Sequence, residues 1–426
     1  MVKVVVVGGG WAGVSAALAA SQAGAEVLLV EKTDLLLGAG LVGGIFRNNG
    51  RFTAAEEALA LGGGAPFKIM DEAAKHRNIE FPGHRHASLY DVTRVEPQMR
   101  RCLEEAGVEI LLETRITGVR VRDGTLYGVI SEEGYLHPGD SFVDCTGTSG
   151  PMGNCIKHGN GCVMCIQRCP AFGPRVSLAA RVGVKEMAAE KREGFHGAMS
   201  GSGELTRESL EPFVLEGLDQ NGIYRVPLPP RLIRGSKLTG KACQQYALPE
   251  YAENLILLDT GHVKVMTPYL PVSELRGIPG FQRARYIDPY AGARGNSIRF
   301  TAIAPRENSL LVKGTANLFC AGEKAGVFVG HTEAVVTGLL AGHNAVRGAL
   351  GLPLLELPRE TAIGDFIAFF EEELMRGEAL KKSYTFSGSI YFARMQALGL
   401  YSTDARAIAA RVASVGLDGV FSQRLL

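Results

Sequence analysis

The chain has 426 residues, enough for two joined α/β domains with large cores, and its formal net charge is +1. A charge this close to zero gives no general electrostatic argument for nucleic acid or an anionic membrane as the partner. No apolar run of about 18 residues occurs, so the sequence predicts no transmembrane helix. The first strand is predicted to begin almost at residue 1, so we expect no signal peptide and a cytoplasmic protein.

The first 31 residues follow the pattern of a dinucleotide-binding βαβ unit. Valines 4–7 predict a strand buried on both faces of a parallel sheet. Gly8, Gly10 and Gly13 then form a G-x-G-x-x-G turn, which lets a pyrophosphate approach the N-terminus of the following helix. Glu31, with Lys32 beside it, ends the second strand where a carboxylate binds a ribose hydroxyl. The alternative is a glycine-rich turn in another kind of parallel α/β protein.

A glycine-rich loop at residues 37–51 is predicted to run beside the cofactor, unless it is a flexible surface loop. Residues 52–74 and 95–106 have helical patterns, with glycines 62–64 interrupting the first. Between them, His84, Arg85 and His86 follow a Pro-Gly turn. Together with Arg47, His84 and Arg85 are candidates for substrate contact, and the alternative is a solvated turn.

Three short strands are predicted at residues 109–112, 116–121 and 126–130, and an apolar strand at 141–144 leads into a second glycine turn. A helix, a small β-meander and a D-x-T-G turn in this order resemble the flavin oxidoreductases of the glutathione-reductase type. That resemblance implies FAD as the cofactor, closed over by Thr146 and Gly147.

Four of the eight cysteines lie close together, in a C-x6-C-x2-C-x3-C-P arrangement. In a chain without a secretory signal, this spacing favours metal ligation over disulfides. The ending is similar to that of bacterial ferredoxin motifs, and we predict one [4Fe–4S] cluster bound by Cys155, Cys162, Cys165 and Cys169. A Cys₄ zinc site and a thiol–disulfide pair at Cys162 and Cys165 are the alternatives.

The second half contains fewer chemical signals. Residues 177–192 have a helical pattern, residues 255–265 predict strands of a substrate domain, and residues 365–426 are rich in helix. Residues 228–241 are basic and bounded by prolines. They are predicted to face an anionic substrate or partner, or else to form a solvated strand edge.

Five segments of the last third resemble the GidA-type tRNA-modifying flavoproteins: residues 275–281, 287–290, 316–323, 338–345 and 357–364. The last segment is most similar to the folate- and FAD-dependent tRNA uracil-5-methyltransferases. The resemblance implies that FAD contacts the backbone at Gly322, Glu323, Gly330, His331 and Thr332, and His331 is also a candidate for substrate contact.

The chain departs from the methyltransferases at one chemically important place. Those enzymes carry a cysteine nucleophile in the glycine-rich loop after the first βαβ unit, whereas residues 38–51 contain no cysteine. A uracil adduct needs a thiolate or an equivalent nucleophile. The resemblance therefore does not carry methyl transfer over to this chain.

The sequence predicts an α/β fold with a Rossmann-like FAD-binding domain, an inserted α+β domain and a helical C-terminus. The predicted boundaries are 1–150 and 271–360 for the FAD-binding parts, 151–270 for the insert and 361–426 for the C-terminal helices. We expect an oxidoreductase that passes electrons between the cluster and FAD, with a small-molecule or folate-linked substrate and a ferredoxin-like electron donor. The alternative function is an RNA-modifying enzyme similar to the folate- and FAD-dependent uracil-5-methyltransferases, acting on tRNA or rRNA, and a homodimer is left open.

Overall fold

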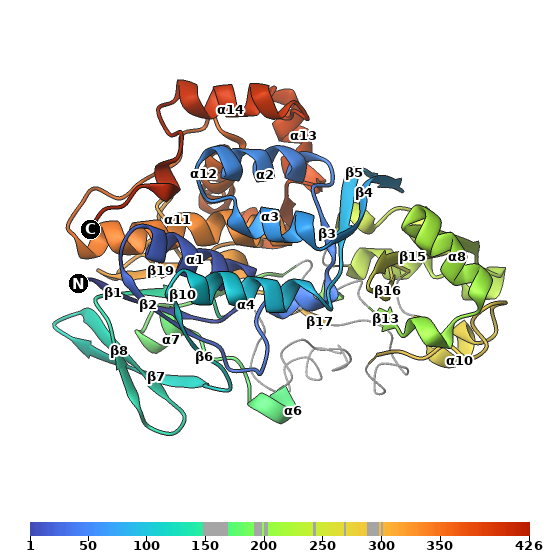
Figure 1. The fold of residues 1–426 in the computed structure, drawn as a ribbon, viewed down its shortest axis with the longest axis horizontal. Coiled ribbons are helices and arrows are strands. Elements are labelled where there is room, and N and C mark those ends of the chain that lie inside the picture. The colour runs from blue at the N-terminus through green and yellow to red at the C-terminus, as the bar shows by residue number, and fades with distance from the viewer. Residues whose placement is uncertain are drawn as a thin grey trace.

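The computed structural model describes residues 1–147, 169–190, 198–199, 203–241, 244–267, 270–287, 298–299 and 301–426. Cys155, Cys162 and Cys165 lie outside these residues. Cys169 lies within them, partly buried at the start of the short helix α6 (Cys169–Phe172). A central sheet with its helices, an inserted antiparallel sheet and a group of C-terminal helices make up the described chain (Figure 1).

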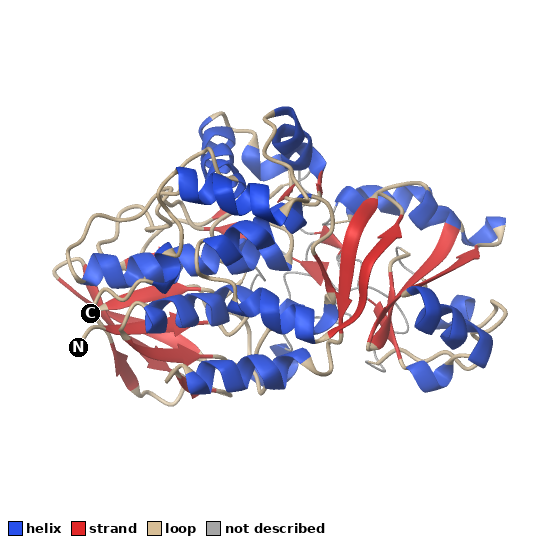
Figure 2. Ribbon diagram, turned by 45° about the horizontal axis from the view of Figure 1, so that its top comes forward, coloured by secondary structure: helices blue, strands red, loops and turns tan. Residues whose placement is uncertain are grey.

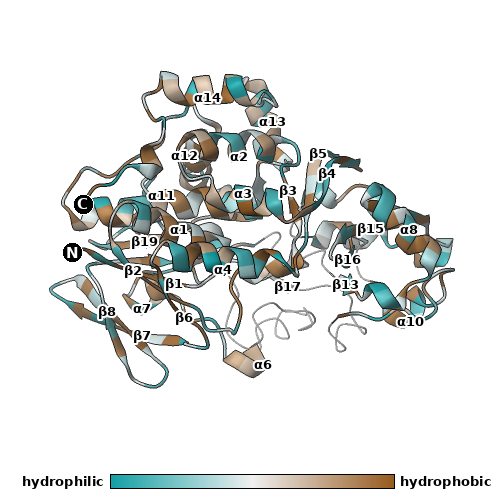
Figure 3. Ribbon diagram, viewed as in Figure 1, coloured by the Kyte–Doolittle hydropathy of each residue, from teal (hydrophilic) through white to brown (hydrophobic). Residues whose placement is uncertain are grey.

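A parallel sheet of five strands forms the centre of the molecule, in the order β19–β10–β1–β2–β6. The strands are β1 (Lys3–Val7), β2 (Glu26–Val30), β6 (Glu109–Leu111), β10 (Ser141–Asp144) and β19 (Leu318–Cys320). Valines 4–7 of β1 are buried, as expected for a strand covered on both faces, and Figure 3 shows the hydrophobic colouring of this region.

Two helices from opposite ends of the sequence pack tightly on this sheet, α1 (Trp11–Gln22) and α11 (His331–Ala349). A Cβ atom added to Gly338 would overlap the carbonyl oxygen of Ala12, and one added to Gly342 would overlap that of Ala16. Because both contacts advance by one helical turn in the same direction, the two helices run parallel. Their N-termini therefore lie at the same edge of the sheet.

Two smaller antiparallel sheets flank the central one. The meander consists of β7 (Ile116–Arg122), β8 (Thr125–Ser131) and β9 (Leu136–Pro138), and the second sheet has the order β3–β5–β4. Its strands are β3 (Ile45–Phe46), β4 (Ala74–Phe81) and β5 (His84–Tyr90). The helices of this part are α2 (Gly50–Ala60), α3 (Ala65–Glu72) and α4 (Val95–Glu105).

The inserted part contains a four-stranded antiparallel sheet in the order β13–β16–β15–β14, which has its own hydrophobic core. Its strands are β13 (Gly203–Leu205), β14 (Ile223–Pro227), β15 (Asn254–Thr260) and β16 (His262–Val265). The helices beside it are α8 (Pro212–Asn221), α9 (Glu250–Glu253) and α10 (Val272–Leu275). Figure 2 shows these strands as a group apart from the central sheet.

The chain ends in three helices, α12 (Ala362–Met375), α13 (Ser389–Ala397) and α14 (Ala405–Ser414), which lie over α2 (Figure 1). Buried Glu57 of α2 holds this group in place, because its carboxylate accepts hydrogen bonds from the backbone N–H groups of Ala362 and Ile363 at the N-terminus of α12. The predicted α/β fold with an inserted α+β part and a helical C-terminus is confirmed, and the sheet of the insert is antiparallel.

Two local predictions are wrong. The described part of the predicted helix at 177–192, residues 177–190, contains one short helix, α7 (Leu178–Arg181), because Gly183 adopts a φ of 91° and ends it, and β11 (Met187–Ala188) then pairs with β18 (Ala302–Ile303). His84 to His86 are not a solvated turn. They begin strand β5, whose pairing with β4 is set by the Pro82–Gly83 turn.

No helix among the described residues is long and apolar enough to span a membrane.

A second short antiparallel pairing, besides that of β11 with β18, joins β12 (Ala198–Met199) to β17 (Ile298–Arg299).

Candidate functional site

A cavity opens at the edge of the central sheet where β1, β2 and β10 end and where α1 and α11 begin. It is lined by the following residues, among others: Gly8, Gly10, Trp11, Glu31, Lys32, Gly40, Val42, Arg115, Cys145, Thr146, Gly147, Arg175, Gly322, Glu323, Gly330 and His331. The carboxyl edge of a parallel sheet is where nucleotides bind in open α/β folds. The structure thus brings most of the predicted cofactor-binding residues to one cavity.

The first glycine turn is shaped by close backbone contacts. Gly8 has a φ of 102°, and a Cβ atom there would overlap the carbonyl group of Cys145. A Cβ atom on Gly13 would overlap the carbonyl oxygen of Gly8. Gly10 is different, because nothing lies within 4 Å of a Cβ atom built on it. Gly8 and Gly13 therefore allow the turn to form, and Gly10 leaves space toward the cavity.

Both helix N-termini at the cavity lack a side-chain cap. Gly10 precedes α1 and Gly330 precedes α11, and neither can supply a capping oxygen. The hydroxyl of Thr332, in the first turn of α11, is fully buried and has no hydrogen-bond partner. Unsatisfied N–H groups and the positive ends of two helices favour an anionic or electron-rich ligand such as the pyrophosphate and flavin of FAD. These residues fit that cofactor.

Glu31 and Lys32 lie on the wall formed by the end of β2. The Glu31 carboxylate accepts hydrogen bonds from the backbone N–H groups of Gly9 at 2.6 Å and of Thr33 at 2.9 Å. Lys32 donates to the carbonyl oxygen of Gly173 at 2.9 Å. Glu31 thus holds the glycine turn against the end of β2, in the position from which a carboxylate reaches a ribose.

Buried Asp144 organises the second glycine turn. Its Oδ1 accepts hydrogen bonds from the backbone N–H and the hydroxyl of Thr146, and its Oδ2 accepts from the backbone N–H of Ala179 at 3.1 Å. Burial opposes ionisation, but the nearby Lys324 and these hydrogen bonds outweigh it, so the pKa of Asp144 is lowered. Asp144 therefore holds both sides of the segment that contains the clustered cysteines.

Lys324 is completely buried behind the cavity, where it forms an ion pair with Glu186 and lies 3.9 Å from Asp144. Burial lowers its pKa to about 7. Arg175, which lines the cavity, reaches Thr146 Oγ1 at 3.4 Å and Glu186 at 3.4 Å. This charged cluster was not predicted, because its members come from four separate parts of the chain.

Three of the four predicted substrate-contact residues do not line the cavity. Arg47 is buried in ion pairs with Asp71 and Glu56. His84 is buried between the rings of Phe81 and Tyr246, and burial lowers its pKa to about 3, so it is a neutral side chain in a core.

Arg85 is exposed to solvent near the start of β5, and its backbone N–H donates to Asn49 Oδ1. Only His331 of the four lies in the cavity.

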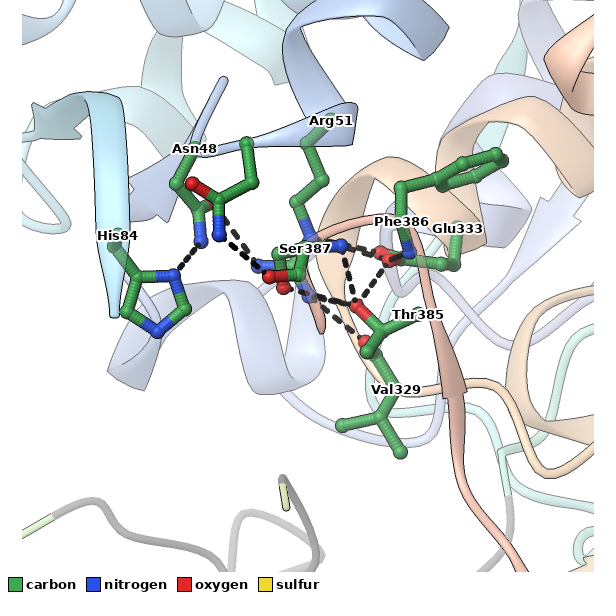
Figure 4. A network of polar contacts seen from close by, with 9 residues as sticks. Asn48, Arg51, His84, Val329, Glu333, Thr385, Phe386 and Ser387 are labelled. Carbon is green, nitrogen blue, oxygen red and sulfur yellow. Dashed lines mark hydrogen bonds and ion pairs between the residues drawn. The ribbon is translucent and has the colours of Figure 1, made fainter. Parts of the chain in front are cut away.

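A buried polar network connects the glycine-rich loop to the start of α11 (Figure 4). Arg51 Nε lies 3.1 Å from both carboxylate oxygens of Glu333, and the same guanidinium donates to the carbonyl oxygen of Val329 and to Thr385 Oγ1. Glu333 also accepts from the backbone N–H of Phe386. The network therefore fixes the N-terminus of α11 against both the loop and the segment that joins α12 to α13.

The insert sheet contributes a buried charged pair next to this loop. Glu204 of β13 and Lys264 of β16 are opposite each other across the two strands. Lys264 donates to the carbonyl oxygen of Val42, which lines the cavity, and Glu204 Oε1 is buried without a hydrogen-bond partner. Burial raises the pKa of Glu204 to about 7, against the opposing effect of Lys264.

The basic stretch at residues 228–241 is partly used inside the protein. Arg234 forms an ion pair with Glu274, and Lys241 is buried with its ammonium bonded to the carbonyl oxygen of Met266. Two of the four cations predicted to face an anionic partner are therefore committed to the fold.

The predicted metal site cannot be traced through the described chain, because three of its four cysteines lie outside it. Within the described residues, no group of three or more His, Cys, Asp or Glu side chains is arranged to hold a metal ion. Cys169 precedes Gly173 by four residues in the sequence. The carbonyl oxygen of Gly173 accepts a hydrogen bond from Lys32, which lines the cavity.

Two protein families match the segments of the chain that form the cavity. Residues 3–150 match the family described as FAD dependent oxidoreductase, and residues 256–353 match the family described as Glucose inhibited division protein A. The fold, the cavity and the first match define the class, that of FAD-dependent oxidoreductase-like flavoproteins.

Within this class the chain is similar to the GidA family over residues 256–353, which include the strand β19 and the helix α11 that complete the cavity.

Individual proteins with similar sequences include enzymes of tRNA modification. The chain is 25% identical to a "tRNA uridine 5-carboxymethylaminomethyl modification enzyme MnmG" of Chlorobium phaeovibrioides, over 91% of this chain and 69% of that protein. It is 28% identical to the enzyme of the same name from Thermus thermophilus, over 84% of this chain and 66% of that protein. The chain thus spans about two thirds of the length of these relatives.

A shorter stretch is 50% identical to "Methylenetetrahydrofolate--tRNA-(uracil-5-)-methyltransferase TrmFO" of Symbiobacterium thermophilum, over 13% of this chain and 12% of that protein. Among solved structures, Aquifex aeolicus GidA superposes with a TM-score of 0.68 at 18% identity, covering 98% of this chain and 73% of that one. At this level of sequence identity, the structural similarity supports the fold and does not identify a substrate.

Proposed function

We propose that this chain is an FAD-dependent oxidoreductase that acts on a uridine of tRNA. One observation carries the proposal: the cavity formed by the two uncapped helix N-termini lies in a chain that is similar over 84–91% of its length to tRNA uridine modification enzymes. Gly8, Gly10 and Glu31 would hold the nucleotide half of FAD, and Gly330 and His331 would meet the flavin. When bound, FAD supplies two-electron redox chemistry.

Two buried thiols, those of Cys145 and Cys320, are poorly suited to forming a thiolate adduct. Cys145 lines the cavity, but burial and the neighbouring Asp144 raise the pKa of its thiol well above the ordinary value. Burial also raises the pKa of the Cys320 thiol. A thiol in this state does not attack a uracil ring at neutral pH. Methyl transfer through Cys145 or Cys320 is therefore not part of the proposal.

The test of the function is the nucleoside composition of tRNA from cells that lack the gene. We expect one 5-substituted uridine to disappear, and to return with the wild-type gene but not with a Gly10→Val variant, whose added methyl groups occupy the cofactor space. Purified protein should also bind tRNA with an affinity that falls steeply with salt concentration. An unchanged nucleoside profile contradicts the tRNA function and directs the search to small-molecule or folate-linked substrates.

A [4Fe–4S] cluster bound by Cys155, Cys162, Cys165 and Cys169 is a second, separate proposal, with a ferredoxin-like protein as the electron donor. Its support is the spacing of the four cysteines, together with the contacts of Asp144, which hold residues on both sides of this segment at the cavity.

Metal analysis of the anaerobically purified protein tests this second proposal. We expect about four irons per chain and an EPR signal on reduction. Both should be lost in Cys162→Ser, while Cys102→Ser, a change in helix α4 outside the cluster, should keep them. Zinc in place of iron would overturn the electron-transfer role and leave the FAD proposal intact.

A further inference from the structure

The side chain of Arg115 forms part of the cavity wall next to Glu31, the carboxylate predicted to bind a ribose. The backbone N–H of Thr114 donates to the carbonyl oxygen of Glu31 at 3.0 Å, so Arg115 lies directly beside the end of β2. Arg115 and Thr33 both line the cavity here. In a dinucleotide bound with its pyrophosphate at Gly10 and its ribose at Glu31, the base lies beyond the ribose. Arg115 is therefore placed where the base is expected.

Two hydrogen bonds fix the plane of the Arg115 guanidinium. Its Nε donates to the carbonyl oxygen of Pro174 at 2.9 Å, and its Nη1 donates to Glu132 Oε1 at 2.9 Å. The Arg115 side chain is 17% exposed, whereas that of Glu132 is 58% exposed. Because the two contacts come from different nitrogens of one rigid plane, the group cannot turn without breaking one of them.

One face of this plane is covered by the backbone of Gly173. A Cβ atom built on Gly173 would lie 2.9 Å from Cζ, 2.9 Å from Nε and 3.0 Å from Cδ of Arg115. At these nearly equal distances from three successive atoms of a flat group, the Cβ position lies above the plane and not within it. Gly173 also has a φ of 71°, which glycine adopts without strain. Glycine at this position thus allows the guanidinium to lie flat against the chain.

We propose that the opposite face of the Arg115 guanidinium stacks on the adenine ring of FAD and selects an adenine nucleotide for the cavity. The inference deepens the proposed function, since it rests on FAD binding and names the group that recognises the base. Guanidinium planes stack on nucleobases, and the two fused rings of a purine offer more contact area than the single ring of a pyrimidine. Glu31 would recognise the ribose, which all ribonucleotides share, and Arg115 the base, in which they differ.

The test compares ADP with UDP, which carry the same ribose and pyrophosphate on different bases. Calorimetric titration of the FAD-free protein should give an affinity for ADP at least about tenfold higher than that for UDP. In Arg115→Lys the positive charge remains and the stacking plane is lost, so the preference for ADP should fall to about twofold or less. A contact with the phosphates, or a loosening of the segment at Gly173, would weaken the binding of both nucleotides equally and leave the ratio unchanged.

Arg120→Lys is the matched control. Arg120 is an exposed residue on β7 that lies outside the cavity lining, so this variant should keep the wild-type preference for ADP. If Arg115→Lys does not fold, Glu132→Ala takes its place, because it removes a mostly exposed carboxylate and leaves the guanidinium present but less firmly oriented. The preference for ADP should then fall by at least about twofold, and an unchanged ratio contradicts the proposal.

Equal affinities of the wild-type protein for ADP and UDP overturn the proposal. No binding of ADP by protein that takes up FAD, or a wild-type ratio in Arg115→Lys, also overturns it. Neither titration involves flavin reduction or tRNA. A protein that prefers ADP but leaves tRNA unmodified thus contradicts the proposed function alone, whereas a protein that binds FAD without a preference for ADP contradicts the base contact alone.

Discussion

Arg51 Nε lies 3.1 Å from each carboxylate oxygen of Glu333, and the two side chains are only 4% and 0% exposed. Arg51 lies in the first turn of α2 and Glu333 lies in the first turn of α11. The pair therefore joins two helices through residues that are 282 positions apart in the sequence. Thr385 and the backbone of Phe386 complete the set of donors around the carboxylate. The pair therefore sets the position of the helix that carries His331 into the cavity.

Replacing Arg51 by Met should strongly destabilise the protein, because it leaves the Glu333 carboxylate buried without its cation. Removing one partner of a buried pair costs about 3–5 kcal/mol of unfolding free energy. The matched control is Lys3→Met, which breaks an ion pair with Glu26 whose side chains are 27% and 50% exposed and should cost at most about 1 kcal/mol. Chemical denaturation of both variants provides the comparison.

The double variant Arg51→Met, Glu333→Met separates charge from packing. Its loss of stability should be smaller than the sum of the two single losses, since no unpaired charge remains. Additive losses would mean that the network holds α11 by packing alone.

Gly10→Val should remove FAD binding without unfolding the protein. A Cβ atom at this position meets no protein atom within 4 Å, so the added side chain extends into the cavity. We expect the affinity for FAD to fall at least about tenfold, equivalent to about 1.4 kcal/mol, with an unchanged melting temperature of the FAD-free protein. Gly13→Ala is the contrasting variant, because its methyl group would overlap the Gly8 carbonyl oxygen and should lower that melting temperature. Full FAD content in Gly10→Val would contradict the assignment of this turn.

Glu204 makes stability depend on pH in a definite direction. Its folded pKa is about 7, above the ordinary 4.5, so between these values the folded protein holds a proton that the unfolded chain releases. Its contribution is present in full below pH 4.5 and is lost as the pH rises through 7. The lost contribution is of the order of 3 kcal/mol.

Glu204→Gln removes this titration. The melting temperature of the variant relative to wild type should therefore rise between pH 5 and pH 8, as measured by thermal unfolding at both values. The Tyr90 hydroxyl nearby keeps its proton across this range, because burial raises its pKa. A constant difference between the two proteins would mean that Glu204 is ionised throughout.

The geometry of the first glycine turn follows from the sequence because most of its contacts are local. Gly13 packs against the Gly8 carbonyl group and Glu31 accepts a hydrogen bond from the Gly9 backbone within one βαβ unit, so the spacing describes this part of the turn. The same holds for the order of strands and helices, since valines 4–7 and the small residues of α11 already indicate burial. The resemblance to GidA-type proteins also points to β19 and α11. These elements come from the last third of the chain and complete the cavity.

The positioning residues could not be found in this way. Tyr90 is an ordinary strand residue in the sequence, and its contacts appear only in the structure, where Trp11, 79 residues away, and His331, 241 residues away, converge on its hydroxyl. Arg47 and His84 show the opposite case. Their residue types suggested substrate contact, but Asp71 and the ring of Tyr246 engage them inside the fold. The role of a reactive side chain depends on tertiary contacts with residues that are distant in the sequence. The spacing of residues along the chain does not reveal these contacts.

Asp144→Asn should loosen the second glycine turn and weaken FAD binding together. The carboxylate accepts bonds from Thr146 at the cavity and from Ala179 beyond the cysteine segment, and it lies 3.9 Å from Lys324. Hydrogen bonds to a buried charged group contribute about 1.5–3 kcal/mol each, so we expect a clear fall in melting temperature at pH 7.

FAD affinity should fall with it, because Thr146 and Arg175 line the cavity from this cluster. Asp140→Asn, an exposed change just before β10 that removes the negative charge from the acceptor of the Lys3 backbone N–H, is the control and should leave FAD affinity unchanged. Equal FAD affinity in both variants, measured by titration of the FAD-free proteins, would mean that the cluster behind the cavity stabilises the fold without shaping the cofactor site.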